Sequence, residues 1–266
     1  MKSKSAFKTQ TFAKSRIATI DVCELGRKKH HVVVMLEVDV TKSREKLKEF
    51  KKKNSRISFQ SWLIKVIAAS VSKNSEVSGF LTGKRKSVVF EDVNISFIVE
   101  KEMEGEKVPI PVLIEKANQL DMESIDKLLN EAKEEVLAKN QTVLQKRSSR
   151  TETIYFLLPA FIRRLIWKSM LKFPGFVFSK MGNVSITSLG MYGKINGWFI
   201  PISIHPLCFG IGSILKKPVV VDDQIEIREM MNMTVLLDHD IIDGANAARF
   251  INQLVKNIGN GAFLSD

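Results

Sequence analysis

The sequence predicts an α/β fold, because stretches typical of strands and stretches typical of amphipathic helices alternate along the whole chain. The clearest strand is HVVVMLEVDV (31–40), which is β-branched, apolar and uninterrupted. The clearest helix begins after Ser58, where an N-cap residue precedes a long apolar segment. With 266 residues, 44% of them hydrophobic, the chain can bury a sizeable core in one large domain or two small ones.

Two helices follow the first strand. Thr41 is the predicted N-cap of a helix over residues 42–54, whose many charges indicate that it is exposed. Ser58 is the predicted N-cap of a helix over 59–74, which has few charges and is expected to pack against a sheet. The residues expected on its inner face are Trp62, Leu63, Val66 and Ile67.

The middle of the chain continues with two strands and a helix. Residues 92–101 alternate apolar and more polar side chains, as half-buried strands do. Residues 108–117 form an extended run in which two prolines favour the edge of a sheet. Asp121 then introduces a helix over about 122–140.

A basic, amphipathic segment separates this part from the last third. Residues 142–153 have the composition of a loop. In residues 154–178, apolar side chains recur at helical spacing with arginines and lysines between them, so the predicted helix is not a membrane span. Two interpretations stay open: this helix covers the protein's own core or a subunit contact, or it binds a membrane surface or a partner.

The last third is rich in strands and ends in a helix. Short turns join the strand segments, and the final helix is expected from Asp243 to about Asn257. The strand segments are 181–193, 208–214, 217–221, 224–230 and 231–239.

Charge and cysteine content narrow the range of functions. The net charge is +12, and residues 1–56 hold 16 Lys and Arg against 6 Asp and Glu, a surface that attracts polyanions. No nucleic-acid-binding signature accompanies this charge, so no nucleic-acid partner is expected. Cys23 and Cys208 make neither a disulfide framework nor a metal site. Because the N-terminus also lacks a secretory signal, we expect a cytoplasmic protein.

One stretch, LLDHDIIDGANAARF (236–250), stands out once common catalytic motifs are excluded. The chain has no GxxxxGK loop, no CxxC or HExxH and no GxSxG. Here His239 ends a predicted strand, and Asp243 and Gly244 begin the next helix. This arrangement suits a general base with a pKa near the operating pH. The pattern alone is equally compatible with a histidine that has no catalytic role and only ends the strand, with Asp243 as a helix cap.

The wider sequence resembles a known family. DHDIIDG is similar to the D-H-R-x-x-D-G signature of the dihydrolipoamide acyltransferases, the cores of 2-oxoacid dehydrogenase complexes. It is also similar to the H-H-x-x-x-D-G signature of chloramphenicol acetyltransferase, which shares their fold. SITSLGMYG (185–193) resembles the family's T-I-S-N-L-G-M-F-G segment, and 30–50 and 198–220 resemble further family segments. The resemblance covers about residues 15–140 and 181–260.

The resemblance implies a chemistry. The protein would be a coenzyme A-dependent acyltransferase that needs no metal and moves an acyl group between coenzyme A and a thiol, or another small or carrier-bound acceptor. His239 would be the general base that deprotonates the thiol. Thr187, which lies 52 residues before it (239 − 187) as in the family, would donate a hydrogen bond to the oxyanion.

The resemblance also implies how His239 is held. Asp243 and Gly244 would form the turn that aims its ring. The segment TIDVCELGRKKH (19–30) is similar to a chloramphenicol acetyltransferase segment whose arginine pairs with the matching aspartate, so Arg27 is the implied partner of Asp243.

The family fold is a two-layer sandwich with a mixed β-sheet that forms homotrimers, with the active site between subunits. His239 and Thr187 would then come from neighbouring chains, and the trimers would be able to assemble further. We expect residues 1–266 to be a single catalytic domain with an atypical insertion at about 142–180, and neither a lipoyl nor a subunit-binding domain.

Three features depart from the family pattern. Asp240 stands where the family has arginine, which reverses the charge beside His239. His205 precedes Pro206 where the family more often has asparagine, and is either a second site residue or a loop histidine. The insertion would close the site, change the substrate or attach the protein to a membrane surface through 154–173. These departures keep open an alternative function, a non-catalytic trimeric assembly protein that binds a membrane or a partner.

Overall fold

The computed structural model describes residues 7–9, 15–53, 57–103, 106–134, 155–190 and 193–264. At its centre six strands form one mixed sheet, in the order β1-β8-β7-β6-β4-β5. Its two parallel pairs are β6 with β7 and β6 with β4, and its other pairs are antiparallel. The strands are β1 (His31–Asp39), β4 (Ile95–Met103), β5 (Glu106–Ile114), β6 (Val184–Ser188), β7 (Leu207–Val221) and β8 (Gln224–Asp238). A small hairpin of β2 (Phe80–Thr82) and β3 (Lys86–Val88) lies outside this sheet.

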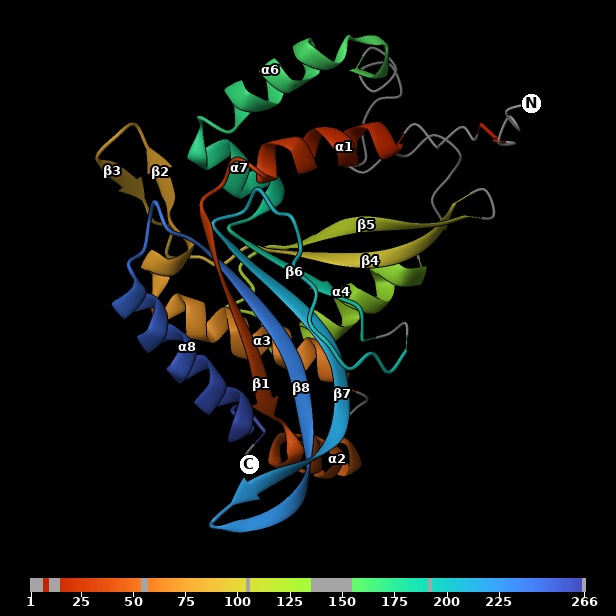
Figure 1. Ribbon diagram of the computed structural model, residues 1–266, viewed down its shortest axis with the longest axis vertical. Helices are drawn as coiled ribbons and strands as arrows, with labels where there is room; N and C mark the ends of the chain where they lie inside the picture. The colour runs from red at the N-terminus through yellow and green to blue at the C-terminus, as the bar shows by residue number, and fades with distance from the viewer. Residues whose placement is uncertain are drawn as a thin grey trace, which may run out of the picture.

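Apart from α2, which lies at the end of the molecule opposite α1 and α6, the helices fall into two groups (Figure 1). Three of them, α3, α4 and α8, lie along one face of the sheet, and α1, α6 and α7 gather at the end where β1 begins (Figure 1). This arrangement confirms the predicted two-layer α/β fold with a mixed sheet. The helices are α1 (Ser15–Gly26), α2 (Thr41–Lys53), α3 (Phe59–Ser72), α4 (Met122–Glu134), α6 (Ala160–Met170), α7 (Pro174–Met181) and α8 (Gly244–Gly259), with a 3₁₀ turn η1 (Ser75–Ser78).

The core lies between the sheet and its helical layer. The four residues predicted on the inner face of α3 are all buried there, and Trp62 donates its indole N–H to the carbonyl of Ala262 at 2.7 Å. The largest fully buried side chains from other elements include Phe97, Phe209 and Phe250. Burying a side chain of this size stabilises the fold by about 1.5–3 kcal/mol, so this layer holds β8, and the turn after it, in a fixed place.

Several expected boundaries are wrong, for local reasons. The four strand segments predicted between 208 and 239 are two strands of 15 residues each, β7 and β8, which pair with each other on both sides of a bulge between Ile211 and Ile214. Thr41 does not cap α2 from outside: it is the first residue of the helix, and the Asp39 carboxylate accepts its N–H at 2.9 Å. Helix α1 was not expected, and the predicted helix over 154–178 is broken at Pro174 into α6 and α7. The predicted loop 142–153 lies outside the described residues.

Candidate active site

His239 lies on a turn that backbone hydrogen bonds fasten at the end of β8. Its N–H donates to the carbonyl of His30 at 2.9 Å, and the N–H groups of Ile241 and Ile242 donate to the carbonyl of Asp238. Its side chain is exposed and makes no side-chain hydrogen bond within the described part of the chain. A fixed backbone that carries an unpaired imidazole leaves both ring nitrogens available to a substrate.

Asp243 and Gly244 complete the turn. Asp243 is the N-cap of α8 and its carboxylate accepts the N–H of Asn246 at 2.9 Å, as the sequence predicted. Gly244 has no atom of the described chain within 4 Å of the point where a Cβ would be, so close backbone packing does not require glycine here. The turn is therefore aimed by the cap at Asp243 and by the pairing of β8 with β1.

The expected pair of Arg27 with Asp243 does not form within the chain. Arg27 is exposed just beyond α1, and no ion pair joins it to another described residue. The basic residue that reaches the end of β8 is instead Lys29, whose Nζ lies 2.6 Å from the buried carboxylate of Asp238. Lys29 is closer to this carboxylate because β1 begins two residues later, where His31 pairs with Asp238.

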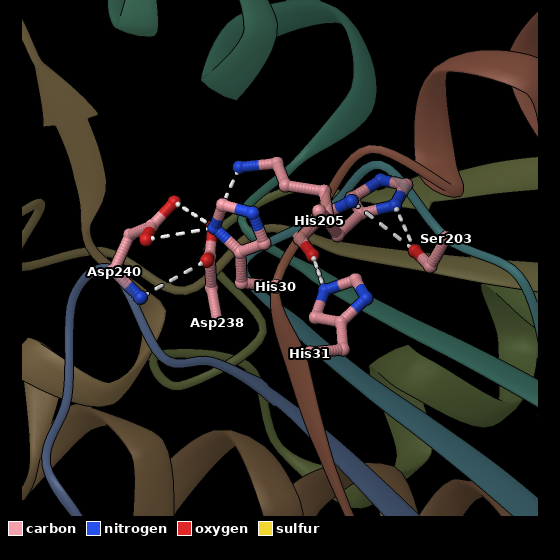
Figure 2. Close-up of polar contacts among 7 residues, drawn as sticks. His30, His31, Ser203, His205, Asp238 and Asp240 are labelled. Atoms are coloured by element: carbon pink, nitrogen blue, oxygen red, sulfur yellow. Dashed lines mark hydrogen bonds and ion pairs between the residues drawn. The ribbon is translucent and has the colours of Figure 1, made fainter.

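Asp240, the residue that departs from the family pattern, has a partner of its own. Its carboxylate oxygens lie 3.0 and 3.1 Å from Nδ1 of His30, and its N–H donates to the Asp238 carboxylate at 3.3 Å (Figure 2). The hydrogen bond to Asp240 raises the pKa of His30, and the carboxylate charge adds to this effect. The Asp240 carboxylate beside His239 therefore has a histidine as its hydrogen-bond partner.

The other two histidines are structural. His31 donates from Nε2 to the carbonyl of His205 at 2.9 Å, and burial lowers its pKa. His205 is buried, and its Nδ1 lies 3.0 Å from the hydroxyl of Ser203 (Figure 2). Its Nε2 lies 3.0 Å from the carbonyl of Met181. Since both ring nitrogens already have partners, His205 is a buried loop histidine and the structure does not place it in a second reacting site.

We expect His205 to make stability depend on pH. Burial lowers its pKa from 6.5 to about 4, so between these values the unfolded chain binds a proton that the native state does not. The free energy of unfolding should therefore fall as the pH drops from 6.5 towards 4, by at most roughly 3 kcal/mol from this group. Urea unfolding at several pH values should show a steeper acid loss in the wild type than in His205→Asn. Parallel losses in the two proteins would contradict a buried neutral ring.

Thr187 lies on β6 and faces the side of the sheet opposite the helical core. It pairs with Gly210 of β7. A Cβ on Gly210 would contact Phe199 and Pro201, so the segment that leads into β7 packs closely against this face of the sheet. The neighbour of Thr187, Ile186, points the other way, into the core. The half-buried Thr187 hydroxyl is thus presented beside the 193–206 segment.

The fold keeps Thr187 and His239 of one chain apart. Thr187 is in register with Gly210 and, through it, with Thr234, which lies five residues before His239 on a strand two places away. Two strand spacings of about 4.8 Å and five residues of about 3.3 Å each separate the two side chains by roughly 20 Å. The two residues of a single chain therefore cannot meet at one reacting atom.

Two adjoining hollows lie beyond the end of β6. The first, of about 480 Å³, is lined by Ser188, Gly190, Ser213 and apolar residues of α3 and β7. The second, of about 570 Å³, shares Arg44, Lys194 and Ile214 with it and adds Lys216 and Lys217. Arg44 and Lys217 are paired with Glu229 and Glu37, whereas no ion pair of Lys194 or Lys216 is present among the described residues. This end of the sheet presents a hollow with free positive charge.

The sequence did not predict Lys29, His30 and Asp238 as part of this region. Their signal was present: KKHH directly before one strand and DHD directly after another place charged residues at one end of an antiparallel pair. The sequence does not say which two strands pair in the folded protein, so the contact between Lys29 and Asp238 could not be predicted. No cluster of three or more potential metal ligands occurs in the described ranges.

The 2-oxoacid dehydrogenases acyltransferase (catalytic domain) family matches residues 8–151 and 179–264 of the chain. The unmatched residues between these two parts, 152–178, include α6. The match therefore covers most of the chain and both segments that carry Thr187 and His239.

Curated relatives agree with this family. A lipoamide acyltransferase component of the branched-chain alpha-keto acid dehydrogenase complex of Pseudomonas putida is 37% identical over 28% of this chain and 18% of its own length. A dihydrolipoyllysine-residue succinyltransferase component of the 2-oxoglutarate dehydrogenase complex of Mus musculus is 24% identical over 84% of this chain and 41% of its own length. The chain thus spans about two fifths or less of the length of these relatives.

Solved structures share the fold. A probable dihydrolipoamide acetyltransferase of Listeria monocytogenes 4b F2365 superposes with a TM-score of 0.69 at 20% identity, over 97% of this chain and 96% of that one. The dihydrolipoamide acetyltransferase of Azotobacter vinelandii also gives 0.69, at 17% identity, over 99% and 95%. Chloramphenicol acetyltransferase gives 0.50 at 8% identity, over 93% and 96%.

Proposed function

The chain belongs to the 2-oxoacid dehydrogenase acyltransferase family, and from this premise we propose that it is a coenzyme A-dependent acyltransferase. It would move an acyl group between coenzyme A and a thiol, or another small or carrier-bound acceptor. The observation that carries the proposal is the exposed imidazole of His239, which no other described side chain engages, on a turn held by backbone hydrogen bonds, together with a hydroxyl residue at the family's distance along the chain.

A solved relative supports the assignment of residues. Crystallographic and enzymatic work on the Azotobacter vinelandii acetyltransferase addressed the catalytic role of a serine, a histidine 52 positions after it and an asparagine four positions after the histidine. Thr187, His239 and Asp243 of this chain have the same two spacings (239 − 187 and 243 − 239). Threonine keeps the hydroxyl of serine, and aspartate keeps the hydrogen-bond acceptor of asparagine.

The proposed mechanism uses His239 as a general base. Its free ring nitrogen takes the proton of the attacking thiol, and the resulting thiolate attacks the thioester carbonyl. The Thr187 hydroxyl then donates a hydrogen bond to the negative oxygen of the tetrahedral intermediate, which one such donor stabilises by about 3 kcal/mol. When the intermediate collapses, the imidazolium of His239 returns the proton to the departing thiolate.

The proposed site lies between subunits. Because the sheet holds Thr187 and His239 of one chain roughly 20 Å apart, a complete site requires Thr187 from one chain and His239 from another. We propose a homotrimer. It is the smallest closed ring, larger than a dimer, in which each chain gives Thr187 to the site on one side and His239 to the site on the other. The dihydrolipoamide acyltransferase relatives belong by name to multienzyme complexes, and further assembly of such trimers is part of the proposal.

The two hollows beyond β6 fit coenzyme A in their chemistry. The first is lined by Ser188 and by residues of α3 on the helical side of the sheet, whereas Thr187 faces the opposite side, so this hollow would hold a part of coenzyme A other than its reacting thiol. The second holds Lys194 and Lys216, whose ammonium groups have no ion pair among the described residues and suit the phosphates of the nucleotide part. When bound, coenzyme A supplies the thiol or thioester that reacts, and these residues would hold its charged end.

Replacing both lysines should weaken the use of acyl-coenzyme A. We expect Lys194→Ala with Lys216→Ala to raise the KM for acyl-coenzyme A by about 10-fold and to leave kcat within a few-fold, since the lost contacts would be far from the reacting atoms. Steady-state kinetics with short-chain acyl-coenzyme A measures this. Lys84→Ala with Lys86→Ala, which removes two exposed charges at the β2–β3 hairpin, is the matched control. Equal KM values in the two double variants would refute the assignment.

The proposal as a whole is tested by turnover. Purified protein should transfer short acyl groups from coenzyme A to at least one member of a panel of thiol, hydroxyl and amine acceptors that includes dihydrolipoamide. If folded, trimeric protein transfers to none of them, the assembly-protein function takes the place of the enzyme.

A further inference from the structure

Helix α6 is fixed on the rest of the protein by a buried polar cluster. Asp21 of α1, which is fully buried, accepts hydrogen bonds from Nε of Arg163 at 2.7 Å and from the hydroxyl of Tyr155 at 2.9 Å. Trp167, also buried, donates its indole N–H to the same hydroxyl at 2.9 Å. Breaking a buried ion pair leaves an uncompensated charge, so the rotation of α6 about its own axis is set.

The opposite side of α6 is apolar and exposed. Phe161 and Leu165 lie one turn apart and are 71% and 65% exposed, and Leu157 in the turn before the helix is 78% exposed. Phe173, just after the helix, is 63% exposed. These four side chains form what we call the α6 face, and α6 is the outermost element at this end of the molecule (Figure 1).

The charge around the α6 face has one sign. Lys168 lies on the same side of the helix as Phe161, seven residues later, and Lys172 follows at the end of the helix. The chain has no Asp or Glu at all between Glu152 and Asp222. The α6 face is apolar and bordered by lysines, with no acidic residue near it in the sequence. These features complement a surface with an apolar interior and negatively charged groups on its outside.

We propose that the α6 face binds the surface of a bilayer that contains anionic phospholipid. The helix would lie in the plane of the membrane, with Phe161 and Leu165 among the acyl chains and Lys168 and Lys172 at the phosphates. Within the described residues no helix has the length and hydropathy needed to cross a membrane. The face is the outer side of a single helix rather than a groove, which fits a lipid surface better than a docked peptide. This inference does not depend on the acyl-transfer activity.

Vesicle flotation of the full chain tests the proposal. We expect the protein to float with phosphatidylcholine vesicles that contain phosphatidylglycerol and to remain below with phosphatidylcholine alone. Phe161→Ser with Leu165→Ser should abolish flotation, and Lys168→Gln with Lys172→Gln should weaken the partition constant by roughly 10-fold. The matched control is Lys51→Gln with Lys52→Gln, which removes two exposed lysines of α2 and should leave binding unchanged.

Three results would overturn the proposal. Flotation unaffected by the Phe161/Leu165 double variant would show that another surface binds. An equal loss in the Lys51/Lys52 control would show that overall charge, and not this face, is responsible. A smaller oligomer in the Phe161/Leu165 variant, seen by sedimentation, would show that the face joins copies of the chain.

A spectroscopic measurement keeps the test independent of folding defects. A polarity-sensitive fluorophore placed through Phe161→Cys, in a Cys23→Ser background, should shift to the blue when anionic vesicles are added. The same fluorophore at Lys51→Cys should not shift. Cys208 is buried, and burial raises the pKa of its thiol to about 12, so it will not take up the label. No shift at position 161 in protein that floats would contradict insertion of this face.

Discussion

His239→Ala is expected to lower kcat/KM for acyl transfer by about 10²–10⁴-fold, the usual contribution of a positioned general base. The loss should appear mainly in kcat, because the imidazole acts on the proton that moves in the transition state. The side chain is exposed and makes no side-chain hydrogen bond in the described structure, so the variant should fold and assemble as the wild type does.

The control for His239→Ala is chemical. Imidazole added to the buffer should restore part of the lost rate, since a small base can enter the space that the ring leaves. Circular dichroism and sedimentation should be unchanged. A variant with full activity would remove His239 from the mechanism and leave Asp243 as a simple helix cap.

Replacing Thr187 should give the second-largest effect. Thr187→Val keeps the shape of the side chain and removes the hydroxyl, and it should lower kcat by about 10²-fold if the hydroxyl stabilises the oxyanion by about 3 kcal/mol. Thr187→Ser keeps the hydroxyl and should stay within a few-fold of the wild type. These two variants control each other, because they separate the hydroxyl from the methyl group.

Two outcomes would contradict a role for Thr187 in oxyanion binding. The first is equal activity of the valine and serine variants. The second is a rise in KM with kcat unchanged, which would mean that the residue only shapes the binding site.

The fold class was predictable because its strongest signals are local. The β-branched run of β1, the cap at Ser58 and the cap at Asp243 each act within a few residues, and all three are confirmed. The continuity of β7 and β8 was not predictable. Pro218 and the polar residues near it look like a strand break in the sequence, but the long β7–β8 hairpin accommodates them.

The candidate site was predictable in part. The turn at His239 and its cap follow from the sequence around them, whereas the partners of this turn come from about 210 residues away. The implied Arg27–Asp243 pair is not among the ion pairs of the described residues, where Lys29 meets Asp238. The family resemblance predicts an ion pair between a basic residue before β1 and an aspartate near His239. The register of β1 on β8 decides which two residues form it.

The reversed charge at Asp240 has a structural explanation. Nδ1 of His30 lies within hydrogen-bond distance of its carboxylate, and the raised pKa of His30 favours the positively charged ring that such a pair needs. The aspartate at this position therefore comes with a histidine partner directly before β1. This pair is exposed, and Asp240 directly follows the candidate base in the chain.

The central claim is that each site combines Thr187 of one chain with His239 of another, and mixing two inactive variants tests it most directly. His239→Ala and Thr187→Val, unfolded together and reassembled in equal amounts, should regain about a quarter of the wild-type activity, because about one interface in four then joins an intact Thr187 to an intact His239. Each variant reassembled alone should keep only its own low residual activity. Activity in the mixture no higher than in the separate variants would contradict a site shared between chains.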